Sequence, residues 1–211
     1  KVYDNSAPSS IIDLWKSVAI RSAKIIFPLT VFSFFFAEPI MIFVYGKQYA
    51  DSAVYFRIIA VVNLVRIVPY APVMLALGKS KEFARIHMLT ALMIVVMEYL
   101  CVRLFPSPCI IAFISILCTI FCLGMLLRCI CKYMNISAME LIPYRSMKML
   151  LVLSLTASIL SKAVSSLLPD VSVIQMLTMS FAIFAVVYLC LCKYVGISYT
   201  YILRKRSRKY I

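Results

Sequence analysis

Long apolar runs separated by short polar breaks dominate this chain. They cover positions 24–45, 52–77, 84–104, 108–131, 147–168 and 171–195. The runs lack the strict alternation of exposed strands and are too long for ordinary strands, so the pattern predicts helices. About 20 apolar residues let a helix cross the hydrocarbon core of a bilayer. A helix also satisfies its own backbone polar groups in lipid. We therefore expect six membrane-spanning helices and no sheet.

Glycine and proline residues separate these runs. Helix-breaking residues follow or divide the runs at Gly46, Gly78, Pro106, Pro108 and Pro169. Pro69 and Pro72 lie inside the second run, where they remove backbone donors and should bend the helix. The polar segment at 132–146 is predicted to form a short helix on the membrane surface.

The composition agrees with a membrane protein. Hydrophobic residues make up 64% of the chain and charged residues only 14%. Soluble domains are about 45–50% apolar and about 25% charged. A water-soluble globule cannot hide so much apolar surface, and a disordered chain or a disulfide-stapled secreted domain is excluded as well.

Basic residues are distributed unevenly between the two sides of the predicted helices. The formal net charge is +14. Lys and Arg gather before the first run, in the segments 78–85 and 128–148, and in the tail Arg204–Lys209. The opposite turns hold little more than Lys47 and Arg103. Basic residues collect in cytoplasmic loops, so both termini are predicted to be cytoplasmic.

The same distribution suggests how the chain is divided. We expect a cytoplasmic or interfacial lead-in at 1–23, a six-helix membrane region at 24–195 and a basic cytoplasmic tail at 196–211. The tail is expected to contact anionic lipid headgroups. Nucleic acid is not an expected partner.

Residues typical of metal or catalytic sites are sparse. The pairs Cys129/Cys131 and Cys190/Cys192 are two residues apart, and such side chains point about 200° apart on a helix. They are better read as small buried residues, so no metal or cofactor is expected. One histidine, no Gly-rich phosphate loop and no acidic pair in a soluble loop argue against an enzyme.

One stretch of the chain resembles a known family. Residues 36–53 read Phe-Ala-Glu-Pro-Ile-Met-Ile-Phe-Val-Tyr-Gly-Lys-Gln-Tyr-Ala-Asp-Ser-Ala, followed by Tyr55-Phe56-Arg57-Ile58 and by Leu75-Ala76-Leu77-Gly78-Lys79-Ser80-Lys81. Together with Pro28 and Pro143, this order resembles the C-terminal half of the polysaccharide flippases. These are the Wzx-like branch of the multidrug/oligosaccharidyl-lipid/polysaccharide exporter superfamily.

The resemblance implies a fold and a function. The chain would be one lobe of a two-lobe, MATE-like transporter, with a missing N-terminal lobe of the same chain as its partner. It would translocate a polyprenyl-diphosphate-linked oligosaccharide across the bacterial inner membrane, for cell-surface polysaccharide biosynthesis. Coupling to a proton or sodium gradient is implied as well. The alternatives are a multidrug-type exporter of the same fold and a membrane enzyme acting on lipid-linked sugars.

Ionisable residues inside the runs are the candidate site residues, because charge is costly in lipid. Asn63, Arg66 and Tyr70 are spaced i, i+3, i+7 and share a helix face with Tyr55. This face is predicted to line a substrate cavity in which Arg66 meets a diphosphate. Alternatively, Arg66 bonds carbonyls freed by the prolines. Lys162 is a weaker cavity candidate, because it can extend to the headgroups.

A second group of charged residues is predicted to serve gating or ion coupling. Glu38, Arg57 and Glu98 should lie at a similar depth in three consecutive helices. We expect Arg57 to pair with Glu38 or Glu98; the alternative is three separate side chains that reach headgroups. His87 shares a helix face with Glu98, which suggests a proton-carrying pair, or else a histidine at headgroup level beside a structural acid.

Overall fold

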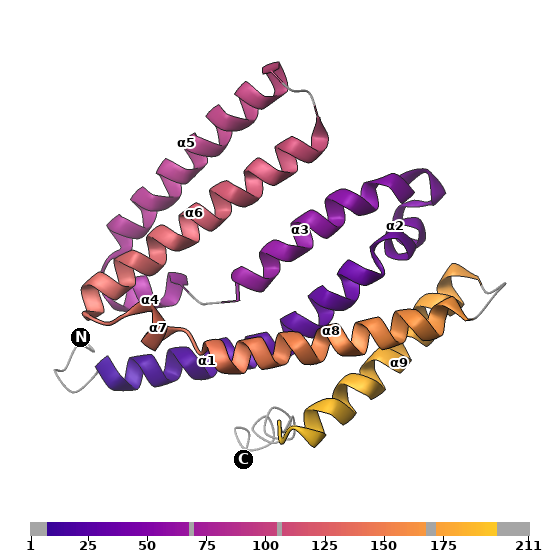
Figure 1. Cartoon of the computed structure of the whole chain (residues 1–211). Coiled ribbons are helices and arrows are strands. Elements are labelled where there is room, and N and C mark those ends of the chain that lie inside the picture. The colour runs from indigo at the N-terminus through magenta and orange to yellow at the C-terminus, as the bar shows by residue number, and fades with distance from the viewer. Residues whose placement is uncertain (1–7, 68–69, 105–106, 168–171, 198–211) are drawn as a thin grey trace, which may run out of the picture.

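Helices account for the regular structure of the described chain. The computed structural model describes residues 8–67, 70–104, 107–167 and 172–197. Its elements in chain order are α1 (Pro8–Phe35), α2 (Ala37–Tyr45), the 3-10 helix η1 (Lys47–Ser52), α3 (Ala53–Val65), α4 (Tyr70–Ala76), α5 (Ser80–Leu104), α6 (Pro108–Met134), α7 (Ala138–Leu141), α8 (Tyr144–Ser166) and α9 (Val173–Tyr194) (Figure 1). Within these ranges there is no strand, as predicted.

Among the described residues, six helical segments are long and apolar enough to cross a bilayer. They are Ile12–Phe35, Lys47–Ala76, Ser80–Leu104, Pro108–Met134, Tyr144–Ser166 and Val173–Tyr194. The six predicted spans are therefore confirmed in number and type, and the chain is a multi-pass helical membrane protein. The short helix predicted within 132–146 is also present, as α7.

The first helix begins earlier than predicted. α1 starts at Pro8 rather than at 24, and it ends at Phe35 rather than at 45. α1 has one continuous buried face, although charged residues interrupt its apolar run. This face is formed at four-residue intervals by Trp15, Ala19, Ala23 and Phe27. The predicted boundary between 23 and 24 thus falls inside α1.

A proline explains why α1 and α2 are separate helices. The N–H of residue i+4 would bond the Phe35 carbonyl in a continuous helix, but that residue is Pro39, which has no N–H. α2 restarts at Ala37, and Glu38 lies in its first turn. A carboxylate there is stabilised by the positive end of the helix dipole.

The second span is interrupted where bending was predicted. α3 ends at Val65 and α4 begins at Tyr70, and residues 68–69 lie outside the described part of the chain. Pro69 cannot donate to the Val65 carbonyl, and Pro72 in the first turn of α4 needs no helical donor. Figure 1 shows α4 displaced from the line of α3.

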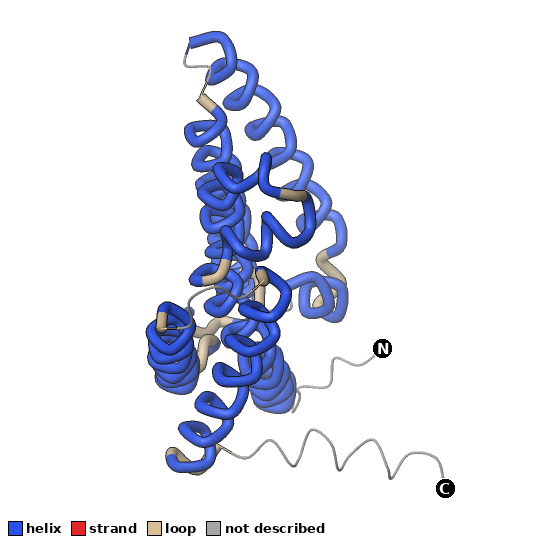
Figure 2. Tube along the Cα trace, turned by 90° about the vertical axis from the view of Figure 1, so that its right-hand side faces the viewer, coloured by secondary structure: helices blue, strands red, loops and turns tan. Residues whose placement is uncertain are grey.

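Six of the helices form a row in which α1 and α3 are the two central helices. α9 packs on α8, α8 on α1, α1 on α3, α3 on α6, and α6 on α5. Figure 1 shows the α5–α6 hairpin standing apart from α1, α8 and α9, and Figure 2 shows short connections between the described helices. The next span along the chain, α5, is not the helix on which α3 mainly packs. Instead α3 packs extensively on α6, because α5 and α6 form a hairpin whose second helix is turned toward α3.

Small residues bring α8 and α9 close together. Ser154, Ala157, Ser158 and Ser161 of α8 are fully buried, and the Ser161 hydroxyl donates to the Ser180 carbonyl of α9 at 2.7 Å. Small residues allow such close backbone approach between membrane helices. By contrast, α5 leaves large side chains such as Met88 and Leu92 exposed, as expected for a surface that faces lipid.

Candidate functional site

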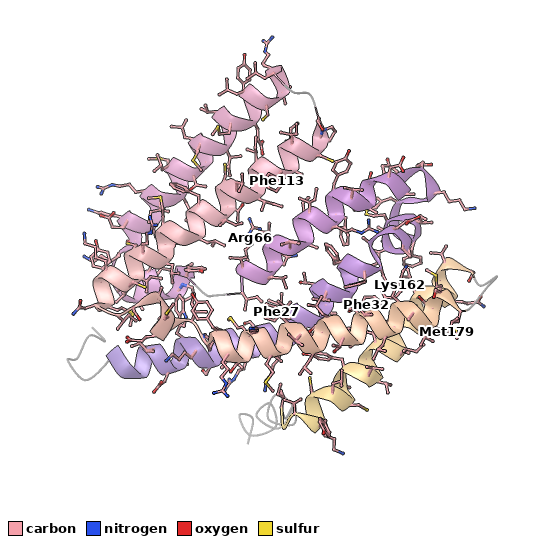
Figure 3. The ribbon with its side chains drawn as sticks, in the orientation of Figure 1. Phe27, Phe32, Arg66, Phe113, Lys162 and Met179 are labelled. Atoms are coloured by element: carbon pink, nitrogen blue, oxygen red, sulfur yellow. The ribbon has the colours of Figure 1, made fainter. Side chains whose placement is uncertain are left out.

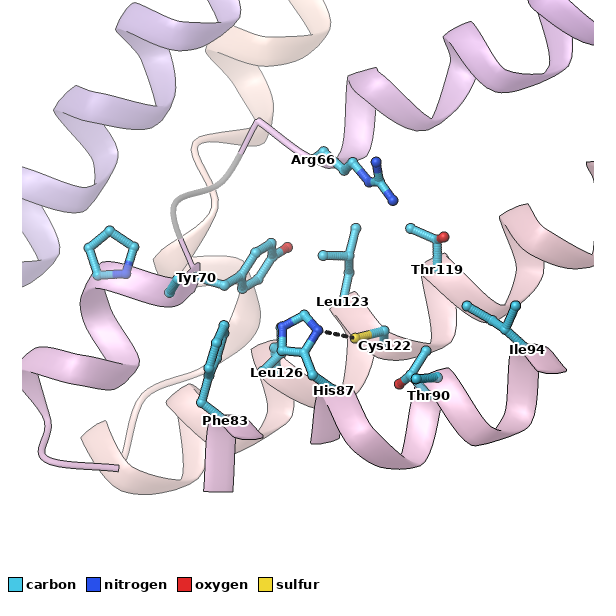
Figure 4. A pocket seen from close by; sticks show the side chains of 13 residues that line it. Arg66, Tyr70, Phe83, His87, Thr90, Ile94, Thr119, Cys122, Leu123 and Leu126 are labelled. Carbon is cyan, nitrogen blue, oxygen red and sulfur yellow. Dashed lines mark hydrogen bonds between the residues drawn. The ribbon is translucent and has the colours of Figure 1, made fainter. Parts of the chain in front are cut away.

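A cavity lies beside the interruption of the second span. It has a volume of about 510 Å³ and lies where the end of α3 and α4 meet the α5–α6 hairpin (Figure 4). It is lined by Arg66, Tyr70, Ala71, Pro72, Phe83, His87, Thr90, Ala91, Ile94, Thr119, Cys122, Leu123 and Leu126. We call it the hairpin cavity. The wall of this cavity is largely apolar, and one arginine, one histidine and a few hydroxyl groups line it as well.

Arg66 lines two cavities rather than one. A second cavity of about 280 Å³ is bounded by Asn63 and Arg66 together with Ile26, Leu29 and Thr30 of α1. We call it the α1 cavity. Asn63 therefore shares the α1 cavity with Arg66, whereas Tyr70 shares the hairpin cavity with it. The interruption at the end of α3 divides the predicted Asn63–Arg66–Tyr70 stripe between two spaces.

Arg66 occupies the position that ends α3. Its own N–H donates to the Val62 carbonyl at 3.1 Å, and its backbone is still helical. In the described part of the chain, its guanidinium has no hydrogen-bond or ion-pair partner, so the predicted alternative of an Arg bonded to freed carbonyls is not seen there. Figure 3 places Arg66 between the two groups of helices.

Tyr70 is held in place from behind by Trp15. Tyr70 is buried, and its ring meets the indole of Trp15 edge-on, with 5.7 Å between the ring centroids. The close-up shows its hydroxyl turned toward the side of the cavity where Arg66 lies (Figure 4). Trp15 was not a predicted site residue, because it precedes the first apolar run that the sequence shows.

His87 belongs to the hairpin cavity and not to a pair with Glu98. Its ring packs edge-on against Phe83 at 4.4 Å, and its Nδ1 lies 3.9 Å from the Cys122 sulfur (Figure 4). Glu98 does not line this cavity; its carboxylate accepts a hydrogen bond from the Ser115 hydroxyl of α6. Sequence reasoning missed Cys122 of α6, which no pattern in the sequence marks. It also missed Thr90, which lies three residues after His87 and could have marked the polar face of α5.

Arg57 does not form the predicted ion pair. Its Nε donates to the Phe34 carbonyl at 3.3 Å, near the end of α1. In the described ranges the only salt bridge is Arg85–Glu82, at 3.2 Å. The prediction that Arg57 pairs with Glu38 or Glu98 is wrong, because no such ion pair is present among the described residues. Arg57 bonds a helix-end carbonyl, Glu38 lies at the start of α2, and Glu98 bonds Ser115.

Two further predicted cavity residues lie elsewhere. Tyr55 is half-buried in the first turns of α3 and lines neither cavity. Lys162 is exposed on α8, with its Nζ 5.1 Å from the centre of the Phe36 ring (Figure 3). A cation over an aromatic face is a favourable contact, and Lys162 lines neither cavity with Arg66.

The charges around Arg66 favour an anionic ligand. Neither cavity has a carboxylate in its lining, so the guanidinium has no internal counter-ion there. Arginine binds phosphate and carboxylate groups through two parallel hydrogen bonds. The described residues contain no group of three His, Cys, Asp or Glu side chains that could hold a metal ion. No family model, curated protein or solved structure matches the chain.

Proposed function

We propose that this chain is one lobe of a flippase that moves a polyprenyl-diphosphate-linked oligosaccharide across a membrane. The observation that carries the proposal is the position of Arg66. It lies at an interruption of a membrane-spanning helix, lines two cavities and has no carboxylate beside it. The order of motifs in residues 36–81, which resembles that of the polysaccharide flippases, supports the same function.

The physical problem of such transport matches what the hairpin cavity offers. A diphosphate cannot cross hydrocarbon without a polar, cationic environment. Arg66 supplies a fixed positive charge, while Tyr70, His87, Thr90 and Thr119 supply hydrogen-bonding groups. The apolar remainder of the wall suits the start of a polyprenyl chain. An interrupted helix at a cavity is also the arrangement that many secondary transporters use for substrate sites.

The surrounding topology follows from this proposal. The basic ends of the helices would face the cytoplasm, both termini included, and the membrane would be the bacterial inner membrane. A second lobe, N-terminal to this one in the same protein, would close the other side of the substrate path. The tail Arg204–Lys209 would contact anionic headgroups.

A multidrug exporter is the second candidate, and the cavity lining disfavours it. Many drugs are cations, and a cation needs a carboxylate where these cavities present Arg66. A membrane enzyme is disfavoured as well. The one nucleophile–base pair in the hairpin cavity, Cys122 and His87, is separated by 3.9 Å. That separation is at the outer limit of a hydrogen bond to sulfur, and no carboxylate lines the cavity to orient the imidazole as a general base.

Ligand binding by the purified chain in lipid nanodiscs tests the proposal. We expect a polyprenyl-diphosphate oligosaccharide to bind more tightly than the corresponding polyprenyl alcohol. Arg66→Ala should weaken binding of the diphosphate at least tenfold, and Arg66→Lys should weaken it less, because Lys keeps the charge but loses the two-pronged contact. Arg128→Ala is the matched control, because Arg128 is exposed on α6 and lines neither cavity.

Two results would contradict the proposal. One is equal affinity for the diphosphate and the alcohol, which would show that the anionic group is not recognised. The other is unchanged diphosphate binding by Arg66→Ala at an unchanged helix content. A flipping assay with both lobes present, in which Arg66→Ala inserts normally but transports nothing, would then connect binding to transport.

A further inference from the structure

A third cavity lies between α1 and the beginning of α8. Its volume is about 400 Å³, and it is lined by Phe27, Tyr144, Arg145, Met147, Lys148 and Leu151. We call it the α8 groove. It shares no residue with the hairpin cavity or the α1 cavity, so it is not part of the site around Arg66.

The two ends of the α8 groove differ in chemistry. Arg145 and Lys148 are exposed and lie three residues apart, side by side on one helix face. Among the described residues neither has an ion-pair or hydrogen-bond partner. Deeper in the groove are Leu151 and Phe27, of which Phe27 is buried in the contact between α1 and α8 (Figure 3).

The position of the groove along the helix matches the layers of a bilayer. Tyr144 and Arg145 open the candidate span Tyr144–Ser166, so they lie where hydrocarbon gives way to headgroups. Leu151 is six residues beyond Arg145, which is about 9 Å further along the helix. The groove therefore runs from the headgroup level into the hydrocarbon.

We propose that the α8 groove binds one anionic phospholipid. Arg145 and Lys148 would hold the phosphate and the anionic headgroup, and one acyl chain would lie against Phe27, Met147 and Leu151. Basic recesses between membrane helices recognise lipids of this kind. The groove carries two cations and no carboxylate, so it discriminates against a zwitterionic lipid whose ammonium group would meet the same cations.

Competition between lipids on the purified full-length chain tests this proposal. Native mass spectrometry would record retention of phosphatidylglycerol against phosphatidylcholine with the same acyl chains. Arg145→Gln/Lys148→Gln should weaken phosphatidylglycerol binding by about 30-fold, because each basic residue near an anionic surface contributes about 1 kcal/mol. Gln keeps much of each side-chain stem, and both positions are exposed, so folding should be preserved.

A matched control separates a built site from general attraction of charge. Arg128→Gln/Lys132→Gln also removes two exposed cations near the end of a spanning helix, but these residues do not line the groove. This control should retain phosphatidylglycerol. The basic tail is present in every variant, so its contribution to lipid binding is the same in all of them. A second variant, Leu151→Trp, keeps both charges and fills the groove, and it should reduce binding of the lipid as well.

Three outcomes would overturn the proposal. They are unchanged phosphatidylglycerol binding by Arg145→Gln/Lys148→Gln, an equal loss in the Arg128→Gln/Lys132→Gln control, and equal retention of phosphatidylcholine by the wild-type chain. Size-exclusion profile and helix content, measured for each variant, identify any that is misfolded. If Leu151→Trp is misfolded, the two charge variants decide the matter.

Discussion

The guanidinium of Arg57 reaches across from α3 to α1 and donates to the carbonyl of Phe34 at 3.3 Å. The last carbonyls of a helix lack donors from their own helix, and a cation there also opposes the negative end of the helix dipole. Arg57 therefore stabilises the end of α1 and ties it to α3. It does so without Glu38 or Glu98, the two carboxylates that the sequence predicted to lie at a similar depth in the membrane.

The role of Arg57 predicts a particular pattern of unfolding free energies. Arg57→Ala should lower the free energy of unfolding in detergent micelles by about 1.5–3 kcal/mol, the usual range for a hydrogen bond to a charged group. Arg57→Ala combined with Glu38→Gln or Glu98→Gln should give additive effects, because Arg57 bonds neither acid. A coupling energy well above about 0.5 kcal/mol in either double-mutant cycle would show that Arg57 does interact with that acid.

Glu98 and Ser115 form a polar link between α5 and α6. Ser115→Ala removes the hydroxyl that donates to the carboxyl group, so we expect a loss of about 1–3 kcal/mol of stability. Glu98→Gln should be milder, since an amide oxygen still accepts from Ser115. Thr178→Ala is a suitable control, because Thr178 is exposed and bonds only backbone carbonyls of its own helix. Equal losses in Ser115→Ala and Thr178→Ala would contradict this assignment.

The close packing of α8 can be tested with one pair of alanines. Ala157 is fully buried against Phe32 and Phe184, whereas Ala163 on the same helix is exposed. Ala157→Leu should destabilise the chain by about 1–3 kcal/mol, because a packed interior has no room for the added methylenes. Ala163→Leu should have little effect. Thermal unfolding of both variants distinguishes them, and similar midpoints would show that α8 is not tightly packed.

The interruption between α3 and α4 should matter for binding more than for stability. Pro69→Ala/Pro72→Ala restores two backbone donors, and Ala is about 3 kcal/mol better than Pro in a helix interior. We expect a chain at least as stable as the wild type, in which Arg66 is carried away from one of its cavities. Polyprenyl-diphosphate binding should fall at least tenfold. Pro143→Ala is the control, because Pro143 lines neither cavity. If the double variant binds the diphosphate like the wild type, the interruption between α3 and α4 is not needed for the site.

The sequence predicted the helices well and their ends less well. Apolar runs divided by Gly46, Gly78 and Pro108 correctly gave the number of spans, since Gly46 and Gly78 have a positive φ that ends a helix and Pro108 suits the first turn of one. The start of α1 was missed because Lys16 and Arg21 interrupt its apolar run. The buried face formed by Trp15, Ala19 and Ala23 becomes evident only by counting in steps of four.

Partners between helices were harder to predict than the helices themselves. A spanning helix is apolar on all sides, so its sequence does not mark which face meets protein and which meets lipid. The packing of α3 on α6 and the placement of Arg66 and His87 around one cavity both depend on that choice. Arg66 and Tyr70 stood out in the sequence because mid-span arginine is rare and proline marks a break, and both line the hairpin cavity.

The edge-on contact between Trp15 and Tyr70 gives the protein an internal optical probe. The chain contains a single tryptophan, and that indole is buried against a ring whose other side lines the hairpin cavity. All tryptophan fluorescence of this chain therefore comes from a side chain that contacts a cavity-lining residue. A ligand that displaces Tyr70 should shift or quench this emission, so occupancy can be titrated in the unlabelled wild-type chain.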